Sequence, residues 1–308
     1  MDGQRKRMVV TGREGQVVRS LLERGAPNGL FDVVALGRPE LDLGEPDRID
    51  AALGQARPDV IVSAAAYTAV DRAETEEARA HAVNAVAPGR IAAVAARLGV
   101  PVIHLSTDYV FDGEKPDPYL ETDPVGPASA YGRTKLAGER AVAQATDNHV
   151  ILRTAWVYSP FGRNFLKTML LLAESRDRID VVDDQVGNPT SALDIADGIL
   201  AIAGNLLADD AARLRGTFHM TGSGSASWAD FASEILAVSA RCGGPVAAIG
   251  RIPSSAYPTS ARRPSNSRLD CGKLYEAHGV RLGSWWHSAE QTVKRLHGQT
   301  TMLSSSSG

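Results

Sequence analysis

The chain has 308 residues, of which 44% are hydrophobic and 22% charged, with a formal net charge of −3 at pH 7. This charge argues against a nucleic-acid-binding protein that works by neutralising phosphates. No apolar run reaches the ~20 residues of a membrane-spanning helix, and the N-terminal segment lacks the apolar part of a secretory signal. Two cysteines are too few for a disulfide framework. The composition therefore favours a cytoplasmic protein of enzyme size.

The first predicted unit is a strand at residues 7–11, a glycine-rich turn and a helix at 17–24. Gly12 and Gly15 in the turn let the backbone approach a ligand, and the free N–H groups of the first helical turn face an anion. This layout suits a pyrophosphate. Val18 stands where a third glycine is expected, so an ordinary turn fits the spacing equally well.

A second strand is predicted at 32–36 and ends in Gly37-Arg38. Sites that prefer NAD carry an acidic residue at this place, whereas a basic residue accommodates the 2′-phosphate of NADP. Arg38 therefore favours NADPH, with NADH not excluded. The alternative is an arginine on a solvated loop.

Three more apolar runs, at 58–67, 102–106 and 150–154, are typical of parallel strands buried on both faces. A helical, alanine-rich segment at 81–98 separates the first two. Strands alternating with helices of this length predict right-handed βαβ units. We expect an α/β fold with a Rossmann-type doubly wound parallel sheet.

Ligands of such sheets bind beyond the carboxyl ends of the strands. Gly12, the segments 64–68 and 106–109, and Trp156 all fall at those ends. The pattern therefore predicts that these segments meet at one edge of one sheet.

Tyr131 and Lys135 are four residues apart beside a predicted helix at 134–145, so they share one helix face. A cation beside a phenol favours the phenolate and lowers the phenol pKa. We therefore expect Tyr131 to act as a general acid for a carbonyl oxygen. The spacing alone equally describes a surface pair.

Several strings together resemble the extended short-chain dehydrogenase/reductase superfamily and, within it, the dTDP-4-dehydrorhamnose reductase family. The resemblance runs from Val9 to about Leu296. The strings are AAAYTAVDRAE at 64–74, STDYVFDG at 106–113, YGRTKLAGE at 131–139, RTAWVY at 153–158, DDQVGNPT at 183–190 and RRPSNSRLD at 262–270.

The resemblance implies an NAD(P)H-dependent reductase of a dTDP-linked 4-keto-6-deoxy sugar, with Tyr131 as the proton donor, Lys135 holding the nicotinamide ribose and Thr107 bonded to the substrate carbonyl. Hydride transfer to a carbonyl carbon leaves charge on oxygen, which a donor hydroxyl stabilises. The implied cofactor site comprises Gly12, Gly15, Gln16, Val17, Arg38, Asp42, Leu43, Ala64, Ala65, Ala66, Tyr131 and Lys135. The implied substrate site comprises Tyr67, Thr68, Thr107, Asp108, Tyr109, Trp156, Arg262, Arg263 and Asn266.

The chain departs from the family pattern at a few positions. Ser63 stands where the family usually has Asn. Ser20 and Leu193 occupy the places of two glutamates that hold magnesium at a dimer interface in some relatives. We therefore expect no metal, although Glu23 and Asp194 lie close by. A homodimer is left open.

The C-terminal half is expected to form a smaller α/β substrate-binding domain. We predict an NAD(P)-binding domain at 1–158, with a return of later segments to it left open, a mainly nucleotide-sugar-binding domain at 159–299 and a disordered tail at 300–308. Ser191 is a candidate helix cap. His219 has the pattern of a structural histidine on a strand.

Arg262 and Arg263 lie in an extended loop rich in proline and serine. Arginine forms bidentate, charge-assisted bonds to phosphate oxygens, so this loop suits a sugar-nucleotide diphosphate. Adjacent residues of an extended loop point to opposite sides, so we expect only one of the two to contact the ligand.

The resemblance implies formation of dTDP-β-L-rhamnose, the last step of dTDP-L-rhamnose synthesis. Two other functions stay open: reduction of another dTDP-4-keto-6-deoxy sugar in antibiotic-sugar synthesis, and a non-catalytic role, either as a regulatory subunit like that of methionine adenosyltransferase or as a redox-sensing module. The intact set of Thr107, Tyr131 and Lys135 favours an enzyme.

Overall fold

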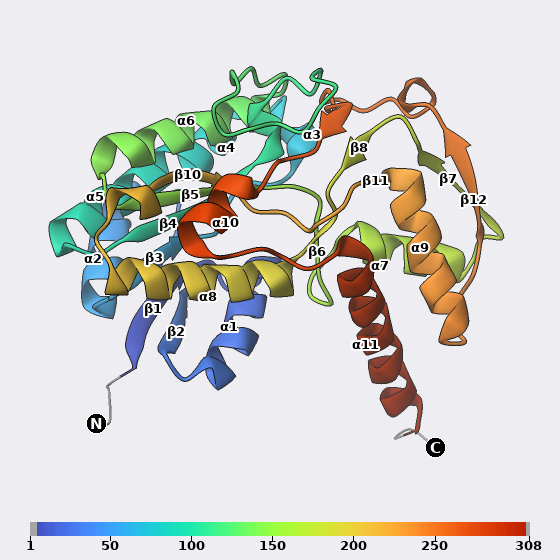
Figure 1. Ribbon diagram of the computed structural model, residues 1–308, viewed down its shortest axis with the longest axis horizontal. Helices are drawn as coiled ribbons and strands as arrows, with labels where there is room; N and C mark the ends of the chain where they lie inside the picture. Colours follow the sequence, from blue (N-terminus) through green and yellow to red (C-terminus); the bar gives the residue numbers. More distant parts are fainter. Residues whose placement is uncertain (1–4, 306–308) are drawn as a thin grey trace.

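A six-stranded parallel sheet forms the centre of the computed structural model, which describes residues 5–305 (Figure 1). The strand order is β10-β5-β4-β3-β1-β2, and every neighbouring pair is parallel. The strands are β1 (Lys6–Thr11), β2 (Phe31–Leu36), β3 (Val60–Ser63), β4 (Val102–Thr107), β5 (His149–Thr154) and β10 (Gly216–His219). This architecture confirms the predicted fold class.

Helices cover both faces of the sheet because successive residues of its strands point to opposite sides. Val10 and Val62 pack in a core with α1 (Gln16–Asn28) and α8 (Ala192–Ala208). Val9 and Ile61, their neighbours in sequence, pack in the opposite core. That core is closed by α2 (Pro46–Ala56), α5 (Ala87–Leu98) and α6 (Ala130–Ala145).

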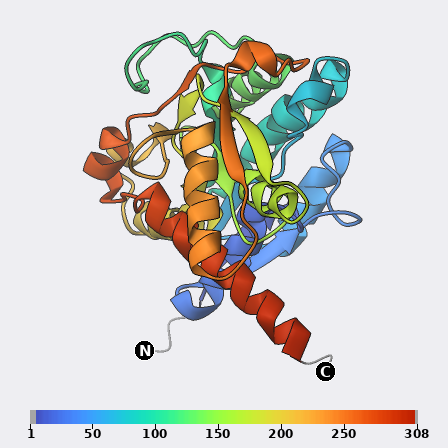
Figure 2. The same ribbon diagram turned by 90° about the vertical axis from the view of Figure 1, so that its right-hand side faces the viewer.

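A second lobe has its own core beside the sheet (Figure 1, Figure 2). It consists of α7 (Phe165–Ala173), α9 (Trp228–Arg241), α11 (Trp285–Ser305) and the parallel pair β7 (Arg178–Val182) and β12 (Ala248–Ile252). Phe231 and Val293 are fully buried in it. The carboxyl end of α11 extends away from both lobes.

Short elements connect these parts and carry several site residues. They are α3 (Val70–Ala73), α4 (Glu77–His81), the π-helical η1 (Ala82–Val86), η2 (Asp108–Val110), β6 (Val157–Tyr158), β8 (Val186–Gly187), β9 (Thr190–Ser191), η3 (Ala212–Leu214), β11 (Ala226–Ser227), η4 (Ser254–Ala256), β13 (Asn266–Ser267) and α10 (Gly272–His278).

The structure refines three expected boundaries. The run at 58–67 is a strand only over Val60–Ser63, because the chain leaves the sheet at Ala64. The helix expected from residue 134 begins at Ala130, where Ser129 caps it. Helix α11 continues to Ser305, through most of the tail that was expected to be disordered, since no proline or glycine interrupts 300–305; residues 306–308 lie outside the described part.

The domain boundary at residue 158 stays a prediction. Helix α8 and strand β10 follow that boundary in sequence, yet α8 packs on the central sheet and β10 extends it beside β5. Within residues 5–305, no helix is both long and apolar enough to cross a membrane.

Candidate active site

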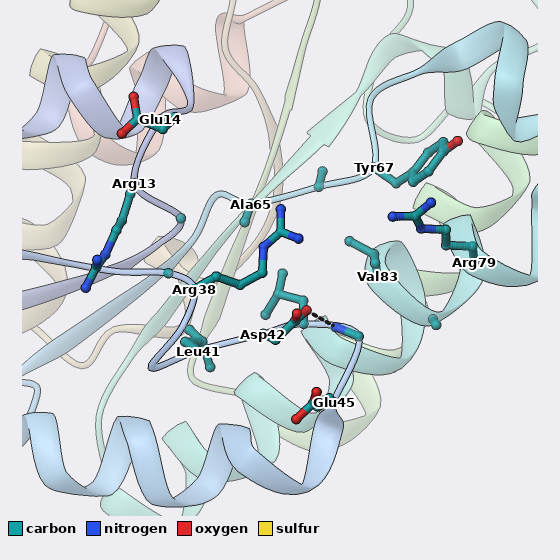
Figure 3. A pocket seen from close by; sticks show the side chains of 16 residues that line it. Arg13, Glu14, Arg38, Leu41, Asp42, Glu45, Ala65, Tyr67, Arg79 and Val83 are labelled. Carbon is teal, nitrogen blue, oxygen red and sulfur yellow. Dashed lines mark hydrogen bonds between the residues drawn. The ribbon is translucent and has the colours of Figure 1, made fainter.

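A cleft of about 870 Å³ opens at the carboxyl ends of β1, β2 and β3 (Figure 3). From β1 the chain turns outward to β2 and then returns past β1 to β3, so the cleft lies at the point where the strand order reverses. Open α/β sheets bind nucleotides at such points. The lining residues are Gly12, Arg13, Glu14, Gly37, Arg38, Leu41, Asp42, Leu43, Gly44, Glu45, Ala65, Ala66, Tyr67, Arg79, Ala82 and Val83.

Many of the expected cofactor residues line this cleft. They are Gly12, Arg38, Asp42, Leu43, Ala65 and Ala66. Gly15, Gln16, Val17 and Ala64 belong to the surrounding elements instead of the lining. Tyr67, which was expected to face the sugar, also contributes to the cleft wall.

The backbone around Gly12 suits a pyrophosphate. Gly12 has a φ of +100°, and a Cβ atom there would lie 3.3 Å from the Cβ of Ala65. Helix α1 begins after Gly15 without a side-chain cap, so its first N–H groups are free to face an anion. Val18, which replaces the third glycine, is buried under this turn. The residues present therefore fit a dinucleotide.

Two groups of opposite charge lie in the cleft. In Figure 3 the Arg38 side chain extends into the cleft toward Ala65, and the Asp42 carboxylate lies beside it. Asp42 accepts a hydrogen bond from the Gly44 N–H at 2.9 Å. A carboxylate suits ribose hydroxyls and a guanidinium suits a 2′-phosphate, so the adenosine end of this cleft has groups for both.

Gln16 points away from the cleft into the second lobe. Its Oε1 accepts hydrogen bonds from Ser159 Oγ at 2.8 Å and from Asn164 Nδ2 at 2.9 Å. Its Nε2 donates to the Val157 carbonyl oxygen at 3.4 Å. The Gln16 side chain therefore connects the two lobes. Only the Gln16 backbone belongs to the glycine turn and first helical turn that are expected to hold the cofactor.

Thr107, Tyr131 and Lys135 lie along the carboxyl-terminal part of β4 and the helix α6. Thr107 is the last residue of β4, and Tyr131 and Lys135 follow one another on the same face of α6. The Thr107 hydroxyl, which is bonded to Asp108 Oδ1 at 3.0 Å, also acts to lower the pKa of Tyr131. Lys135 is 3% exposed, and its Nζ donates to the Leu105 carbonyl oxygen at 2.6 Å.

The expected lowering of the Tyr131 pKa is wrong for this structure. Burial raises the pKa of Tyr131, and the nearby charge of Asp108 raises it further. The ammonium of Lys135 is bonded to a backbone carbonyl instead of the phenol. Burial lowers the pKa of Lys135 to about 8, while Glu139, one turn farther along α6, opposes this shift. Tyr131 therefore keeps its hydroxyl proton at neutral pH.

The start of α6 is anchored from several sides. Ser129 Oγ accepts from the Gly132 N–H at 3.2 Å, and Glu74 Oε1 accepts from the Ala130 N–H at 2.8 Å. A Cβ atom at Gly132 would collide with the Tyr109 carbonyl oxygen, so glycine allows the first turn to lie against η2. These contacts set the position of the Tyr131 hydroxyl.

Tyr109 and Asp108, two residues expected to contact the sugar, are neighbours of Tyr131. The rings of Tyr109 and Tyr131 meet edge to face, with centroids 5.5 Å apart. Asp108 is 4% exposed, and burial raises its pKa to about 6. Thr68, by contrast, is exposed and does not line the cleft.

The two adjacent arginines have different partners. Arg263 donates to the Tyr109 hydroxyl at 3.2 Å and to Asp71 at 2.5 Å, and its side chain is 24% exposed. Arg262 pairs with Glu114 at 2.6 Å, and its side chain is 64% exposed. Arg263 is thus the one beside the tyrosines, as expected for opposite sides of an extended loop.

Asn266 has a structural role here. Its Nδ2 donates to the carbonyl oxygens of Lys115 and Asp117 at 2.6 and 2.8 Å, and its Oδ1 accepts from Arg268. Both amide hydrogens hold the loop at 115–117 instead of pointing at a ligand. A direct contact of Asn266 with the substrate stays a prediction that this arrangement does not favour.

The family model described as "RmlD substrate binding domain" matches residues 6–297. A dTDP-4-dehydrorhamnose reductase of Sinorhizobium fredii is 50% identical over 290 residues, which cover 94% of this chain and 97% of the relative. The chain belongs to the dTDP-4-dehydrorhamnose reductase family. This confirms the resemblance found in the sequence.

Two further comparisons bear on ligands. The crystal structure of a dTDP-4-dehydrorhamnose reductase from Bacillus anthracis in complex with NADP has a TM-score of 0.87, 30% sequence identity and coverage of 94% of this chain and 99% of that chain. A Streptomyces antibioticus protein named "Probable dTDP-4,6-dihydroxy-2-methyloxan-3-one 4-ketoreductase" is 44% identical over 231 residues, covering 75% of this chain and 76% of the relative.

In this reductase-family chain, Trp156 is held at the junction of the lobes. It has a φ of +48° and stacks on Trp228 with centroids 3.5 Å apart and an interplanar angle of 7°. A Cβ atom at Gly187 would collide with its indole, so glycine leaves room for the ring. Trp156 is half-buried. Its contact with the sugar stays a prediction.

Sequence reasoning missed Asn84, which is fully buried in the π-helical segment η1. Its Oδ1 accepts from the Tyr67 N–H at 2.8 Å, and its Nδ2 donates to the Tyr67 carbonyl oxygen and to Thr134 Oγ1, both at 3.1 Å. Asn84 thereby joins the cleft wall to α6. The available signal was an asparagine, a weak helix former, inside an alanine-rich helix.

Several cleft residues were missed as well. Arg13 and Arg79 are among the residues that line the cleft. Arg79 lies over the Tyr67 ring at 5.9 Å, and Arg13 pairs with Glu40 at 2.6 Å. Both are in polar segments next to recognised motifs, where charge alone does not separate a ligand contact from a surface residue.

Glu23 and Asp194, which lie close to the positions compared with the magnesium-binding glutamates of some relatives, are bonded to other residues of this chain. Glu23 forms a bidentate ion pair with Arg295 at 2.7 and 2.8 Å, and Asp194 accepts from Ser288 Oγ at 2.6 Å. Across residues 5–305, no three histidine, cysteine or acidic side chains are grouped as metal ligands. The absence of a metal stays a prediction.

His219 is fully buried, as expected of a structural histidine. Its Nδ1 lies 3.1 Å from the Asp270 carbonyl oxygen, and burial lowers its pKa to about 3. It is therefore neutral at physiological pH and lies outside the group around Tyr131.

Proposed function

We propose that the protein reduces dTDP-4-dehydro-β-L-rhamnose to dTDP-β-L-rhamnose with NAD(P)H, the last step of dTDP-L-rhamnose biosynthesis. One observation carries the proposal: a dinucleotide-sized cleft opens at the carboxyl edge of the sheet in a chain of this reductase family, which has Thr107 at the end of β4 and Tyr131 and Lys135 on one face of α6. The protein is accordingly an oxidoreductase that acts on a nucleotide sugar.

The proposed mechanism assigns each residue one task. When bound, the nicotinamide supplies a hydride to the sugar C4. Thr107 donates a hydrogen bond that fixes the carbonyl oxygen, and Tyr131 gives its hydroxyl proton to the same oxygen as charge develops. Lys135, whose ammonium is bonded to the Leu105 carbonyl oxygen in this structure, would hold the nicotinamide ribose and supply the positive charge that stabilises the remaining tyrosinate. Burial of Lys135 strengthens this electrostatic effect.

The nucleotide part of the substrate is proposed to lie toward the second lobe. Tyr67, Thr68, Asp108, Tyr109 and Trp156 would contact the sugar and its surroundings. Arg263 is the arginine proposed for the diphosphate, because its guanidinium lies beside Tyr109 whereas Arg262 points to Glu114. The thymine is proposed to bind in the second lobe.

NADPH is proposed as the preferred cofactor, with NADH also used, because Arg38 and Asp42 both face the cleft. Replacing Arg38 with Ala should lower kcat/KM with NADPH by about tenfold, the loss of one charge-assisted phosphate bond, and change kcat/KM with NADH little. Steady-state rates with both cofactors test this. An equal loss with NADPH and NADH would contradict a role in 2′-phosphate recognition.

One alternative has a specific observation behind it. The Streptomyces relative is named for a different dTDP-linked ketosugar, so reduction of another dTDP-4-keto-6-deoxy sugar is the second candidate.

A cytoplasmic location and a homodimer are further parts of the proposal. Size-exclusion chromatography with light scattering tests the dimer.

The deciding experiment follows NADPH absorbance with dTDP-4-keto-L-rhamnose formed in place from dTDP-4-keto-6-deoxyglucose and its epimerase. Oxidation that needs the epimerase and yields dTDP-rhamnose is the expected result. Oxidation without the epimerase would move the substrate to the unepimerised ketosugar. Absence of oxidation in folded protein that binds NADPH would contradict the enzyme and favour a binding role.

A further inference from the structure

Asp71 lies in the AYTAVDRAE segment, on the short helix α3, and has two bonds to one distant loop. Its Oδ1 accepts from the Ala261 N–H at 3.0 Å, and its Oδ2 accepts from Arg263 Nη2 at 2.5 Å. The two partners are separated from Asp71 by most of the sequence, yet one carboxylate holds both the backbone of the loop and the guanidinium that follows it.

The guanidinium of Arg263 is thereby fixed at two points. Nη2 is bound by Asp71, and Nη1 donates to the Tyr109 hydroxyl at 3.2 Å. The Tyr109 ring packs against Tyr131, the proposed proton donor. Arg263 is consequently held at a defined place next to the reaction centre.

These two bonds do not exhaust the donors of Arg263. A guanidinium carries five N–H groups in a planar fork. Among the contacts of the described residues, Asp71 and Tyr109 engage one hydrogen on each terminal nitrogen. The Nε–H and a second hydrogen on each terminal nitrogen stay available for phosphate oxygens, which arginine binds in bidentate geometry.

We propose that Asp71 is a positioning residue that orients Arg263 to bind the diphosphate of a nucleoside-diphosphate sugar. The proposal rests on the proposed function and adds a specificity element to the same site. Holding the guanidinium in place before binding avoids the loss of side-chain freedom that a mobile arginine would suffer on binding. Asp71 touches no reacting atom, so it acts through Arg263.

Asp71→Asn tests the proposal because it is nearly isosteric. The amide oxygen still accepts from the Ala261 N–H, whereas the amide NH₂ can no longer accept from Arg263. The Asp71 side chain is 45% exposed, so the fold should tolerate the change. Glu114→Gln is the matched control, since it removes the carboxylate partner of the neighbouring Arg262 on the outer side of the loop.

The measurement is calorimetric binding of dTDP, with thymidine and NADPH as comparison ligands. D71N should weaken dTDP binding about tenfold, the loss expected when a charge-assisted bond is no longer well placed, and leave thymidine and NADPH binding unchanged. E114Q should bind all three ligands like the wild type. In turnover, D71N should raise KM for the ketosugar nucleotide about tenfold with kcat within about twofold.

A double-mutant cycle shows whether Asp71 acts through Arg263. D71N should add nothing to R263A, because residues in one network are not additive. Additive losses would overturn the proposal, as would unchanged or tighter dTDP binding by D71N, the latter showing that Asp71 competes with the diphosphate. Should D71N fail to fold, Asp71→Ser keeps an oxygen near Ala261, removes the charge and has the same expected outcome.

These measurements distinguish failure of the proposed function from failure of the role proposed for Asp71. If the wild type binds no dTDP, both the nucleotide-sugar substrate and the role of Asp71 are overturned. If the wild type binds dTDP and reduces the ketosugar while D71N matches it in both, only the role of Asp71 is overturned.

Discussion

Tyr131 is surrounded by groups that keep its hydroxyl protonated. Burial and the charge of Asp108 raise its pKa, whereas the Thr107 side chain acts in the opposite direction. A neutral phenol is the form that can give a proton to a carbonyl oxygen. The environment of this residue therefore keeps it in the protonated form from which the proposed reduction would begin.

Replacing Tyr131 with Phe should lower kcat by roughly a hundredfold or more, the usual range for loss of a general acid. The affinity for NADPH should change little, because the ring stays and only the hydroxyl is lost. Tyr275→Phe, at a side chain 50% exposed on α10, is the control and should be fully active. Wild-type turnover in Y131F would contradict the proposed role.

Lys135 predicts how activity depends on pH. Burial lowers its pKa from 10.5 to about 8, so the ammonium that supports Tyr131 is lost as pH rises through about 8. We expect kcat/KM to fall by about tenfold per pH unit above that value. A pH profile of kcat/KM tests this, and constant activity well above pH 8 would contradict it.

The contribution of Lys135 to the free energy of unfolding should rise with pH over the range in which kcat/KM falls. Between about 8 and 10.5 the unfolded chain keeps the Lys135 proton while the folded chain has lost it. The unfolded state then binds more protons, so the contribution of Lys135 to the free energy of unfolding rises with pH in this window. Melting curves in the same buffers therefore separate loss of activity from loss of fold.

Among the elements, α6 is the one that brings Tyr131, the proposed proton donor, to the sheet edge. Ser129 caps its first turn, Glu74 binds the next backbone N–H, and Asn84 bonds to Thr134 farther along. Each contact comes from a different stretch of sequence. The position of Tyr131 thus depends on how several segments meet the N-terminus of one helix.

Two helix caps offer a matched comparison. Ser129 Oγ and Ser191 Oγ each accept a backbone N–H at 3.2 Å, at the starts of α6 and α8, and both residues are buried. Changing either to Ala should lower the free energy of unfolding by about 1 kcal/mol. Only S129A should also lower kcat, because only α6 carries Tyr131. Equal kcat values in the two variants would argue against cap-dependent positioning.

At the scale of the whole molecule, the two lobes are joined next to the cofactor loop. Gln16 bonds to Val157, Ser159 and Asn164, and the Phe161 ring lies between Arg19 and Arg295 at 4.7 and 5.1 Å. Asn164 is itself the cap of α7. The loop expected to hold the pyrophosphate is therefore mechanically coupled to the second lobe.

Replacing Gln16 with Ala should lower the free energy of unfolding by about 1–2 kcal/mol through lost hydrogen bonds. The KM for the ketosugar should rise because the second lobe is less well held, while the Kd for NADPH stays near wild type. Gln55→Ala, at an exposed position on α2, is the control for all three measurements. A weaker NADPH affinity with unchanged stability and KM would show that the Gln16 side chain faces the cofactor instead.

Local sequence patterns were enough to predict the alternation of strands and helices, the glycine turn after β1 and the shared helix face of Tyr131 and Lys135. These features depend on local periodicity and backbone freedom, which short segments carry on their own. Family strings were recognisable for the same reason, and the comparisons confirm them.

The environment of each group, by contrast, depends on how distant segments pack together. The pKa of Tyr131 is raised where an adjacent lysine predicted a lower value, because burial and Asp108 outweigh a lysine that is bonded to the Leu105 carbonyl. Likewise Arg263 and Arg262 are neighbours with different partners, since Asp71 is distant in sequence and adjacent in space. Desolvation and long-range pairing depend on which segments pack together, and no local pattern contains that information.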